Sequence, residues 1–87
     1  MSAPLADALA EIAKTNNLTV ISVDFRRNPV AEEYRFDCYV HWLADEGDKS
    51  CISGGGATAE EAIKSAITNS AAYRAQCVSA LTLELAA

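Results

Sequence analysis

The sequence is poor in positive charge: its 87 residues include only seven Lys and Arg against twelve Asp and Glu, a net charge of −5. Nucleic-acid-binding surfaces draw much of their free energy from Lys and Arg that neutralise phosphates and release counterions. A broad phosphate-contacting surface is therefore not expected. The excess of carboxylates indicates either a protein partner with a basic surface or a charged exterior that only keeps the chain soluble.

Histidine and cysteine are too few, and too widely spaced, for a metal centre or a disulfide framework. His41 is the only histidine, and the three cysteines are Cys38, Cys51 and Cys77. No CxxC pair occurs, so we expect neither a metal site nor a cofactor. Reduced thiols in a cytoplasmic protein are the simplest interpretation.

Long apolar runs are also missing. No segment approaches the length of a membrane span, and the N-terminus lacks the basic and apolar regions of a secretory leader. Apolar residues nevertheless make up 51% of the chain and charged residues 22%, a balance typical of folded domains. At this length we expect a single domain over residues 1–87.

The N-terminal segment has the apolar spacing of a helix. Leu5, Leu9 and Ile12 share one face, which predicts a helix over residues 3–15 with Ser2 as its N-cap. A Thr-Asn-Asn sequence then ends the helix, because asparagine tolerates the left-handed conformation in which many helices stop.

Alternation of apolar and polar side chains predicts three strands, over residues 18–26, 33–42 and about 49–53. An Asn-Pro turn and a polar turn at residues 45–48, whose glycine can take a positive φ, connect them into an antiparallel sheet. One face meets solvent and the other forms the core. The core face is expected to carry Ile21, Val23, Phe25, Phe36, Cys38, Val40 and Trp42.

Three consecutive glycines at residues 54–56 separate the third strand from a second helix. They suggest a phosphate-binding loop, but no Gly-Lys-Ser/Thr sequence follows, and Glu60 and Glu61 occupy the first turn of the helix. We interpret the glycines as a structural turn that lets strand and helix pack closely. Thr58 and Glu61 predict a capping box, in which the hydroxyl of Thr58 accepts from the amide of Glu61 and the Glu61 carboxylate accepts from the amide of Thr58.

The second helix is expected to end between Ala72 and Ala75. Its inward stripe would comprise Ala59, Ala62, Ile63, Ala66, Ile67 and Ser70. Beyond it, alternation of Leu81, Leu83 and Leu85 favours a fourth strand, with extension of the helix as the alternative. The predicted fold is therefore an α+β two-layer domain of order α-β-β-β-α(-β), an antiparallel sheet with both helices on one face.

Candidate binding residues lie on the solvent face of the second strand and around its two ends. They are Glu32, Glu33, Arg35, Asp37, Tyr39, His41, Asp45, Glu46 and Asp48. An ordinary solvated surface, a contact surface for Lys or Arg of a partner, and a catalytic use of His41 are the alternatives. No catalytic residue is assigned, because an imidazole without a paired nucleophile or base is weak evidence.

The segments PLADALAEIAK, LTVISVDFR, EEYRFDCYVHW, KSCIS and TAEEAIKSAITNSAA follow one another as helix, three strands and helix. Over residues 4–73 this order resembles the double-stranded-RNA-binding domain, which implies the same topology. That family binds RNA through basic residues at the start of its last helix. This chain has Ala59, Glu60 and Glu61 there, with Lys64 nearby, so the phosphate contacts are missing where they matter.

The segment SCISGGGATAEEAIKSAI is similar to the strand, glycine turn and helix of HicB-type antitoxins, which bind and inhibit a small toxin ribonuclease. In size and acidic charge the chain also resembles phage-encoded inhibitors such as anti-CRISPR proteins. These resemblances imply a non-enzymatic protein that inhibits or regulates a protein partner by covering a basic, nucleic-acid-binding surface. The alternatives are a nucleic-acid-binding module and a small enzyme that uses Tyr39, His41 and a cysteine. An unpaired strand edge would also allow a homodimer.

Overall fold

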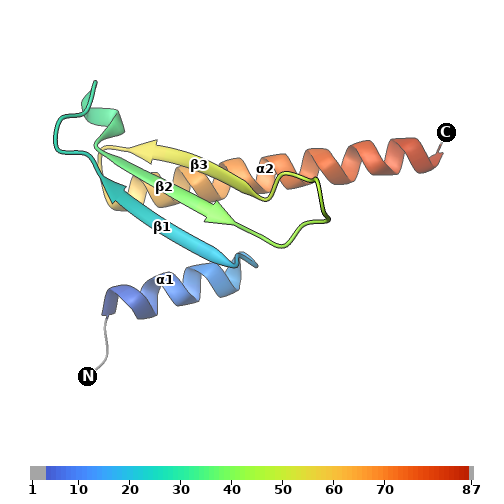
Figure 1. The fold of residues 1–87 in the computed structure, drawn as a ribbon, viewed down its shortest axis with the longest axis horizontal. Coiled ribbons are helices and arrows are strands. Elements are labelled where there is room, and N and C mark those ends of the chain that lie inside the picture. Colours follow the sequence, from blue (N-terminus) through green and yellow to red (C-terminus); the bar gives the residue numbers. More distant parts are fainter. Residues whose placement is uncertain (1–3, 87) are drawn as a thin grey trace.

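A computed structural model describes residues 4–86 of the chain and the side chains of residues 5–76. The elements are helix α1 (Pro4–Thr15), strand β1 (Val20–Phe25), the 3-10 helix η1 (Glu32–Tyr34), strands β2 (Phe36–His41) and β3 (Cys51–Gly56), and helix α2 (Ala59–Ala86). The strands form one antiparallel sheet in the order β1-β2-β3, with α2 packed on it (Figure 1). The predicted α+β class and α-β-β-β-α order are confirmed. No helix in this part of the chain is long and apolar enough to cross a membrane.

Helix α1 ends where the asparagines predict. Asn17 takes a left-handed φ of 55°, its amide donates to the carbonyl of Lys14 at 3.3 Å, and the amide of Leu18 donates to Ala13 at 2.8 Å. This pair of hydrogen bonds is a Schellman motif, and Leu18 becomes part of the core. The helix lies beside β1 and contacts mainly that strand (Figure 1). The expected N-cap, Ser2, lies outside the described residues.

The contact between α2 and the sheet depends on glycines that belong to β3. A Cβ added to Gly54 would lie 2.3 Å from the backbone nitrogen of Ala66, and one added to Gly56 would lie 2.6 Å from that of Ala62. The predicted turn at residues 54–56 is therefore wrong: the strand continues through the glycines, because the absence of side chains lets the helix axis approach. The prediction that they allow close packing is confirmed.

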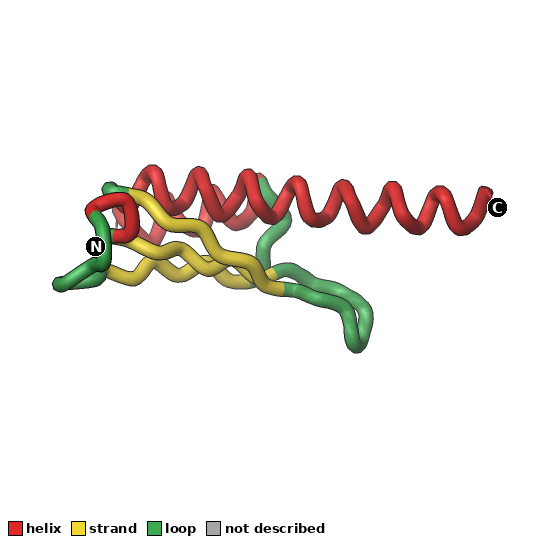
Figure 2. The backbone as a smooth tube through the Cα atoms, turned by 90° about the horizontal axis from the view of Figure 1, so that it is seen from above, coloured by secondary structure: helices red, strands yellow, loops and turns green. Residues whose placement is uncertain are grey.

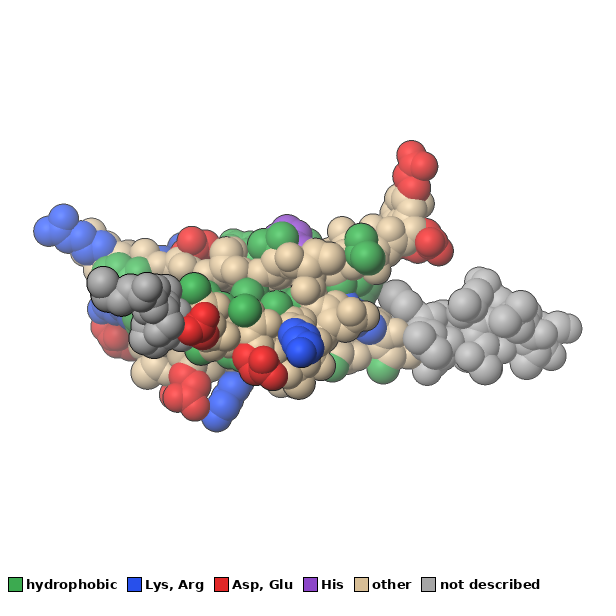
Figure 3. Space-filling model, turned by 90° about the horizontal axis from the view of Figure 1, so that it is seen from below, with side chains coloured by type: hydrophobic (Ala, Val, Ile, Leu, Met, Phe, Trp, Pro, Cys, Tyr) green, Lys and Arg blue, Asp and Glu red, His purple; other side chains and the backbone are tan. Residues whose placement is uncertain are grey.

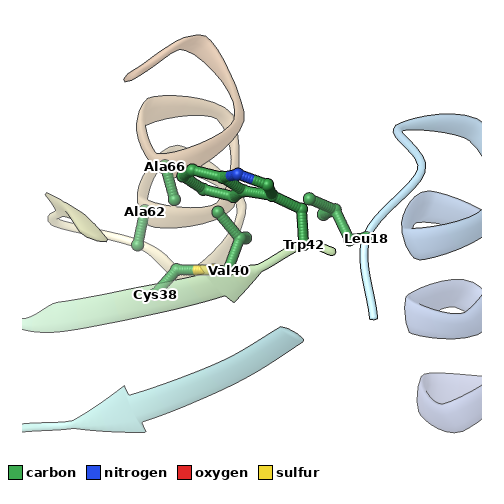
Figure 4. Close-up of a cluster of buried hydrophobic side chains, with 6 residues drawn as sticks. All are labelled: Leu18, Cys38, Val40, Trp42, Ala62 and Ala66. Carbon is green, nitrogen blue, oxygen red and sulfur yellow. The ribbon is translucent and has the colours of Figure 1, made fainter. Parts of the chain in front are cut away.

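The core is small and lies between α2 and the middle of the sheet (Figure 4). Its buried apolar members are Leu18, Cys38, Val40, Trp42, Ala62 and Ala66. Phe25 was expected among them but is 63% exposed. Phe25 lies on the face that alternation assigned to it, in edge contact with the ring of Phe36. It stays exposed because α2 covers β3 and β2 and makes few contacts with β1.

Helix α2 continues to Ala86, well past the predicted end at residues 72–75. The fourth strand proposed for residues 81–86 is therefore wrong, and the alternative of a longer helix is correct. No glycine or proline occurs after Gly56, and Ala, Leu, Gln and Glu all favour helix, so nothing in the sequence stops it.

Strand β2 begins later than predicted because the chain first forms η1. Arg35 donates to the carbonyls of Arg26 and Arg27 at 3.1 and 2.8 Å and forms an ion pair with Glu32. These contacts hold residues 32–34 in a turn. Glu33, Tyr34 and Arg35 therefore precede the strand in which they were expected.

Candidate functional site

On the sheet face opposite α2, side chains of the three strands lie in rows across the sheet. The rows follow from the strand register, which the spacing of residues within each strand does not determine. The rows are Val20–His41–Cys51, Ser22–Tyr39–Ser53 and Asp24–Asp37–Gly55. We call this surface the open face. Figure 2 shows α2 running along the other side of the sheet, so the open face is free of that helix.

On the open face, His41 and Cys51 lie side by side. The Cys51 sulfur is 3.6 Å from Nε2 of His41, within hydrogen-bonding range for sulfur. The sequence allows an enzyme that combines His41 with a cysteine but does not indicate which cysteine, because only the register of the β2–β3 hairpin brings His41 opposite Cys51. Tyr39, one row further along, is 37% exposed.

At the η1 end of the sheet, the candidate carboxylates already have cationic partners. Asp37 forms an ion pair with Arg26, and Glu32 forms one with Arg35. The hydrogen bond from Arg35, followed by its positive charge, lowers the pKa of the Glu32 carboxyl below its ordinary value. Both carboxylates are therefore largely occupied within the chain. Glu33 is exposed beside them.

The opposite end of the sheet has a different character. We call residues 45–48 the acidic hairpin; its carboxylates, Asp45, Glu46 and Asp48, are all exposed and form no ion pair with any described residue. The amide of Asp48 donates to the carbonyl of Asp45 at 2.9 Å, and Gly47 takes the predicted positive φ, 89°. The next cation, Lys49, is turned toward α2, with its Nζ 5.1 Å from the ring centroid of Tyr73.

The acidic hairpin also projects from the body of the molecule. Figure 2 shows the β2–β3 connection extending past the sheet and away from α2, and Figure 3 shows acidic side chains standing out at that corner. The nine candidate residues thus do not form one cluster. The paired charges and the exposed Glu33, which is in no ion pair with a described residue, lie at one end. Tyr39 and His41 lie between, and the unpaired carboxylates of the acidic hairpin lie at the other end.

The start of α2 is acidic and internally capped. The amide of Glu61 donates to Thr58 Oγ1 at 3.1 Å, as predicted, but the Glu61 carboxylate accepts from the amide of Ala57 at 3.0 Å instead of that of Thr58. Glu60 pairs with Lys64 at 3.3 Å. An incoming phosphate would meet two carboxylates here, and the nearest cation is already partnered.

No group of three or more potential metal-binding side chains occurs among the described residues. Cys38 is fully buried, and burial, with a smaller effect of Asp24, raises the pKa of its thiol to about 11. Its predicted place in the core is confirmed. The side chain of Cys77 is outside the described set.

Comparison of the chain with protein-family models, curated proteins and solved structures finds no match. The observed α-β-β-β-α order, with its three-stranded antiparallel sheet, is consistent with a topology like that of the double-stranded-RNA-binding domain.

Proposed function

We propose that this protein is a non-enzymatic binding protein that inhibits or regulates a protein partner by covering a basic surface. The observation that carries the proposal is the contrast between the two ends of the sheet. Glu32 and Asp37 are neutralised by arginines of the same chain, whereas the carboxylates of the acidic hairpin have no described cationic partner. Those charges are available to a partner.

A projecting loop with unpaired carboxylates suits competition with phosphate groups. Lys and Arg that bind nucleic acid can be contacted by carboxylates instead, and charge complementarity of this kind raises the association rate and selects the partner. Tyr39 and His41 would extend the contact along the open face, because a tyrosine offers both apolar area and a hydrogen-bonding group.

The biological type we propose is a cytoplasmic inhibitor encoded by a phage or another mobile element, of the anti-CRISPR or antitoxin kind. Its support is the acidic charge, the small size, and the similarity of residues 50–67 to the antitoxin segment. The occluded surface would then be one that handles nucleic acid.

Affinity capture from the native host, with the protein immobilised, tests the proposal. Asp45→Lys/Glu46→Lys reverses the sign of the hairpin charge, and Asp7→Lys/Glu11→Lys makes the same change in net charge on the exposed surface of α1. We expect the hairpin variant to lose a protein that wild type and the α1 variant both retain. Equal loss of the captured protein in both variants would mean that only the net charge of the chain matters. Retention of the captured protein by both variants would rule out the acidic hairpin as the binding site.

A nucleic-acid-binding function predicts a different outcome. It requires salt-dependent binding to duplex RNA or DNA, with affinity falling steeply as salt is raised. Arg26 and Arg35 are paired within the chain, and the start of α2 is acidic, so we expect no such binding in direct titrations. Strong, salt-sensitive binding would replace the proposed function with this alternative.

The small-enzyme alternative is favoured by one observation, the contact between Cys51 and His41. Among the described residues, no second side chain hydrogen-bonds to the imidazole to orient it as a catalytic base, as a triad would require. Retained activity in a His41→Ala variant would end this alternative.

A further inference from the structure

We propose that Cys51 is a modification site: its thiol forms mixed disulfides with small-molecule disulfides, and His41 takes up the thiol proton. The two residues are a cross-strand pair joined by the 3.6 Å contact between Sγ and Nε2. The site does not use the carboxylates of the acidic hairpin, and it is tested on the protein without a partner.

The backbone holds the pair in place. The amide of Trp42 donates to the carbonyl of Ser50 at 3.0 Å, immediately beyond the pair, and the amide of Thr19 donates to the carbonyl of His41 at 2.8 Å. The peptide unit that joins His41 to Trp42 is therefore hydrogen-bonded on both sides, to Ser50 and to Thr19. Directly opposed residues of antiparallel strands have closely spaced side chains, which explains the contact without any rearrangement.

The pair is also within reach of a reagent. Cys51 and His41 are partly exposed, and they lie on the open face, away from α2. Figure 3 shows the imidazole of the only histidine at the molecular surface. Cys38 is fully buried on the other side of the same sheet, so one protein contains an accessible thiol with a base and an inaccessible thiol without one.

The reaction needs only a disulfide as oxidant. Nε2 of His41 accepts the proton of Cys51, and the thiolate attacks one sulfur of the reagent. A bond forms between that sulfur and Sγ while the reagent's sulfur–sulfur bond breaks. The departing thiolate receives the proton from His41, so Cys51 is oxidised and half of the reagent is reduced.

Reaction with an aromatic disulfide that releases a coloured thiol tests the site in the full chain. With Cys77→Ser as the background, we expect one rapidly released equivalent, and none over the same period in Cys51→Ser/Cys77→Ser. Adding His41→Gln should slow the reaction about tenfold or more, the scale of a lost proton acceptor. Ser22→Ala, a change on the same face that leaves the pair intact, should react like the background.

A second test compares the reaction rate of Cys51 in the folded and the unfolded protein and does not depend on the His41 variant. Cys51 in the folded Cys38→Ser/Cys77→Ser protein should react faster than in the same protein unfolded in urea, because only the fold places His41 beside it. Slower reaction in the folded state, an unchanged rate in a folded His41→Gln variant, or modification at Cys38 instead of Cys51 would each overturn the proposal.

Discussion

Gly54 shows how much of this fold depends on the absence of a single Cβ atom. The atom that a Cβ at this position would meet first is backbone, the nitrogen of Ala66, which cannot rotate away. Gly55 is its natural comparison, because it points to the open face, where the nearest atom to an added Cβ is 3.4 Å away.

We predict that Gly54→Ala lowers the free energy of unfolding by about 1–3 kcal/mol or more, the usual cost of overpacking a close contact. Gly55→Ala should change it little, since the contact is ordinary and alanine loses less backbone entropy on folding. Urea denaturation of both variants measures the difference. Equal effects would mean that the helix does not rest on this strand.

Cys38 makes stability depend on alkaline pH. Its folded-state pKa of about 11 lies above the ordinary value of 9.0, so the unfolded chain releases the thiol proton first as pH rises. The contribution of the neutral Cys38 thiol to the free energy of unfolding is complete below pH 9 and is lost as pH rises toward 11. Cys38→Ala should therefore show a shallower decline of unfolding free energy across that window. Parallel declines in the two proteins would contradict a buried neutral thiol.

The residues of β2 and Trp42, which follows it, were the most predictable from sequence, because strict alternation assigns each side chain to one face. Cys38, Val40 and Trp42 are buried as expected. The same rule failed at Phe25, since burial also depends on which strands the helix covers. The pairing of His41 with Cys51 could not be predicted either, because alternation within a strand does not specify the register of its neighbour.

At the scale of elements, the start of α2 follows its sequence signal closely. Thr58→Ala should lower the free energy of unfolding by about 1 kcal/mol, because the amide of Glu61 loses its acceptor. Thr58→Ser keeps the hydroxyl and should recover most of that loss. Thermal unfolding of the pair provides the measurement, and identical stability of the alanine and serine variants would show that the cap is not formed.

Arg74 connects α2 to the end of α1. Its guanidinium donates to the carbonyls of Asn16 and Asn17, both at 3.0 Å, and lies 4.7 Å from the ring centroid of Trp42. This contact could not be predicted from the sequence, because Arg74 is 58 residues from Asn16 and 57 from Asn17 and no local pattern connects them.

We predict that Arg74→Ala lowers the free energy of unfolding by about 2 kcal/mol, the range for hydrogen bonds to a charged donor. Arg74→Lys should restore only part of this, because an ammonium group cannot donate to both carbonyls with the planar geometry of a guanidinium. Chemical denaturation distinguishes the variants. Full stability of the lysine protein would mean that charge alone matters at this position.

At the scale of the whole molecule, the chain is more extended than a compact domain of the same length. Its radius of gyration is 15.0 Å, against about 12 Å for a compact domain of this size, and its principal extents are 49 × 36 × 19 Å. The long α2 and the projecting hairpin both contribute (Figures 1 and 2). The sequence patterns left a longer α2 open only as the alternative to a fourth strand, and the preferred end of the helix fell about three to four turns too early.

A second copy of the chain can pair with an unpaired strand edge, so the outer strands determine where a homodimer could form; the homodimer itself stays a prediction. β1 and β3 are the outer strands of the sheet. On β3 the carbonyl of Ser53 accepts from Asn69 Nδ2 of α2 at 3.0 Å, which occupies part of that edge. The outer edge of β1 has no strand beside it in the described part of the chain, and α1 lies next to the start of β1 (Figure 1), so we expect any homodimer to form along the rest of that edge.

The distribution of charge leads to the central claim, that the acidic hairpin meets a basic surface on a protein partner. The most direct test is the association rate constant with the captured partner, measured at increasing salt for wild type, Asp45→Lys/Glu46→Lys and Asp7→Lys/Glu11→Lys. Electrostatic steering predicts a rate that falls with salt for wild type and the α1 variant, and a slower, nearly salt-independent rate for the hairpin variant. The same salt dependence in all three proteins would contradict the account.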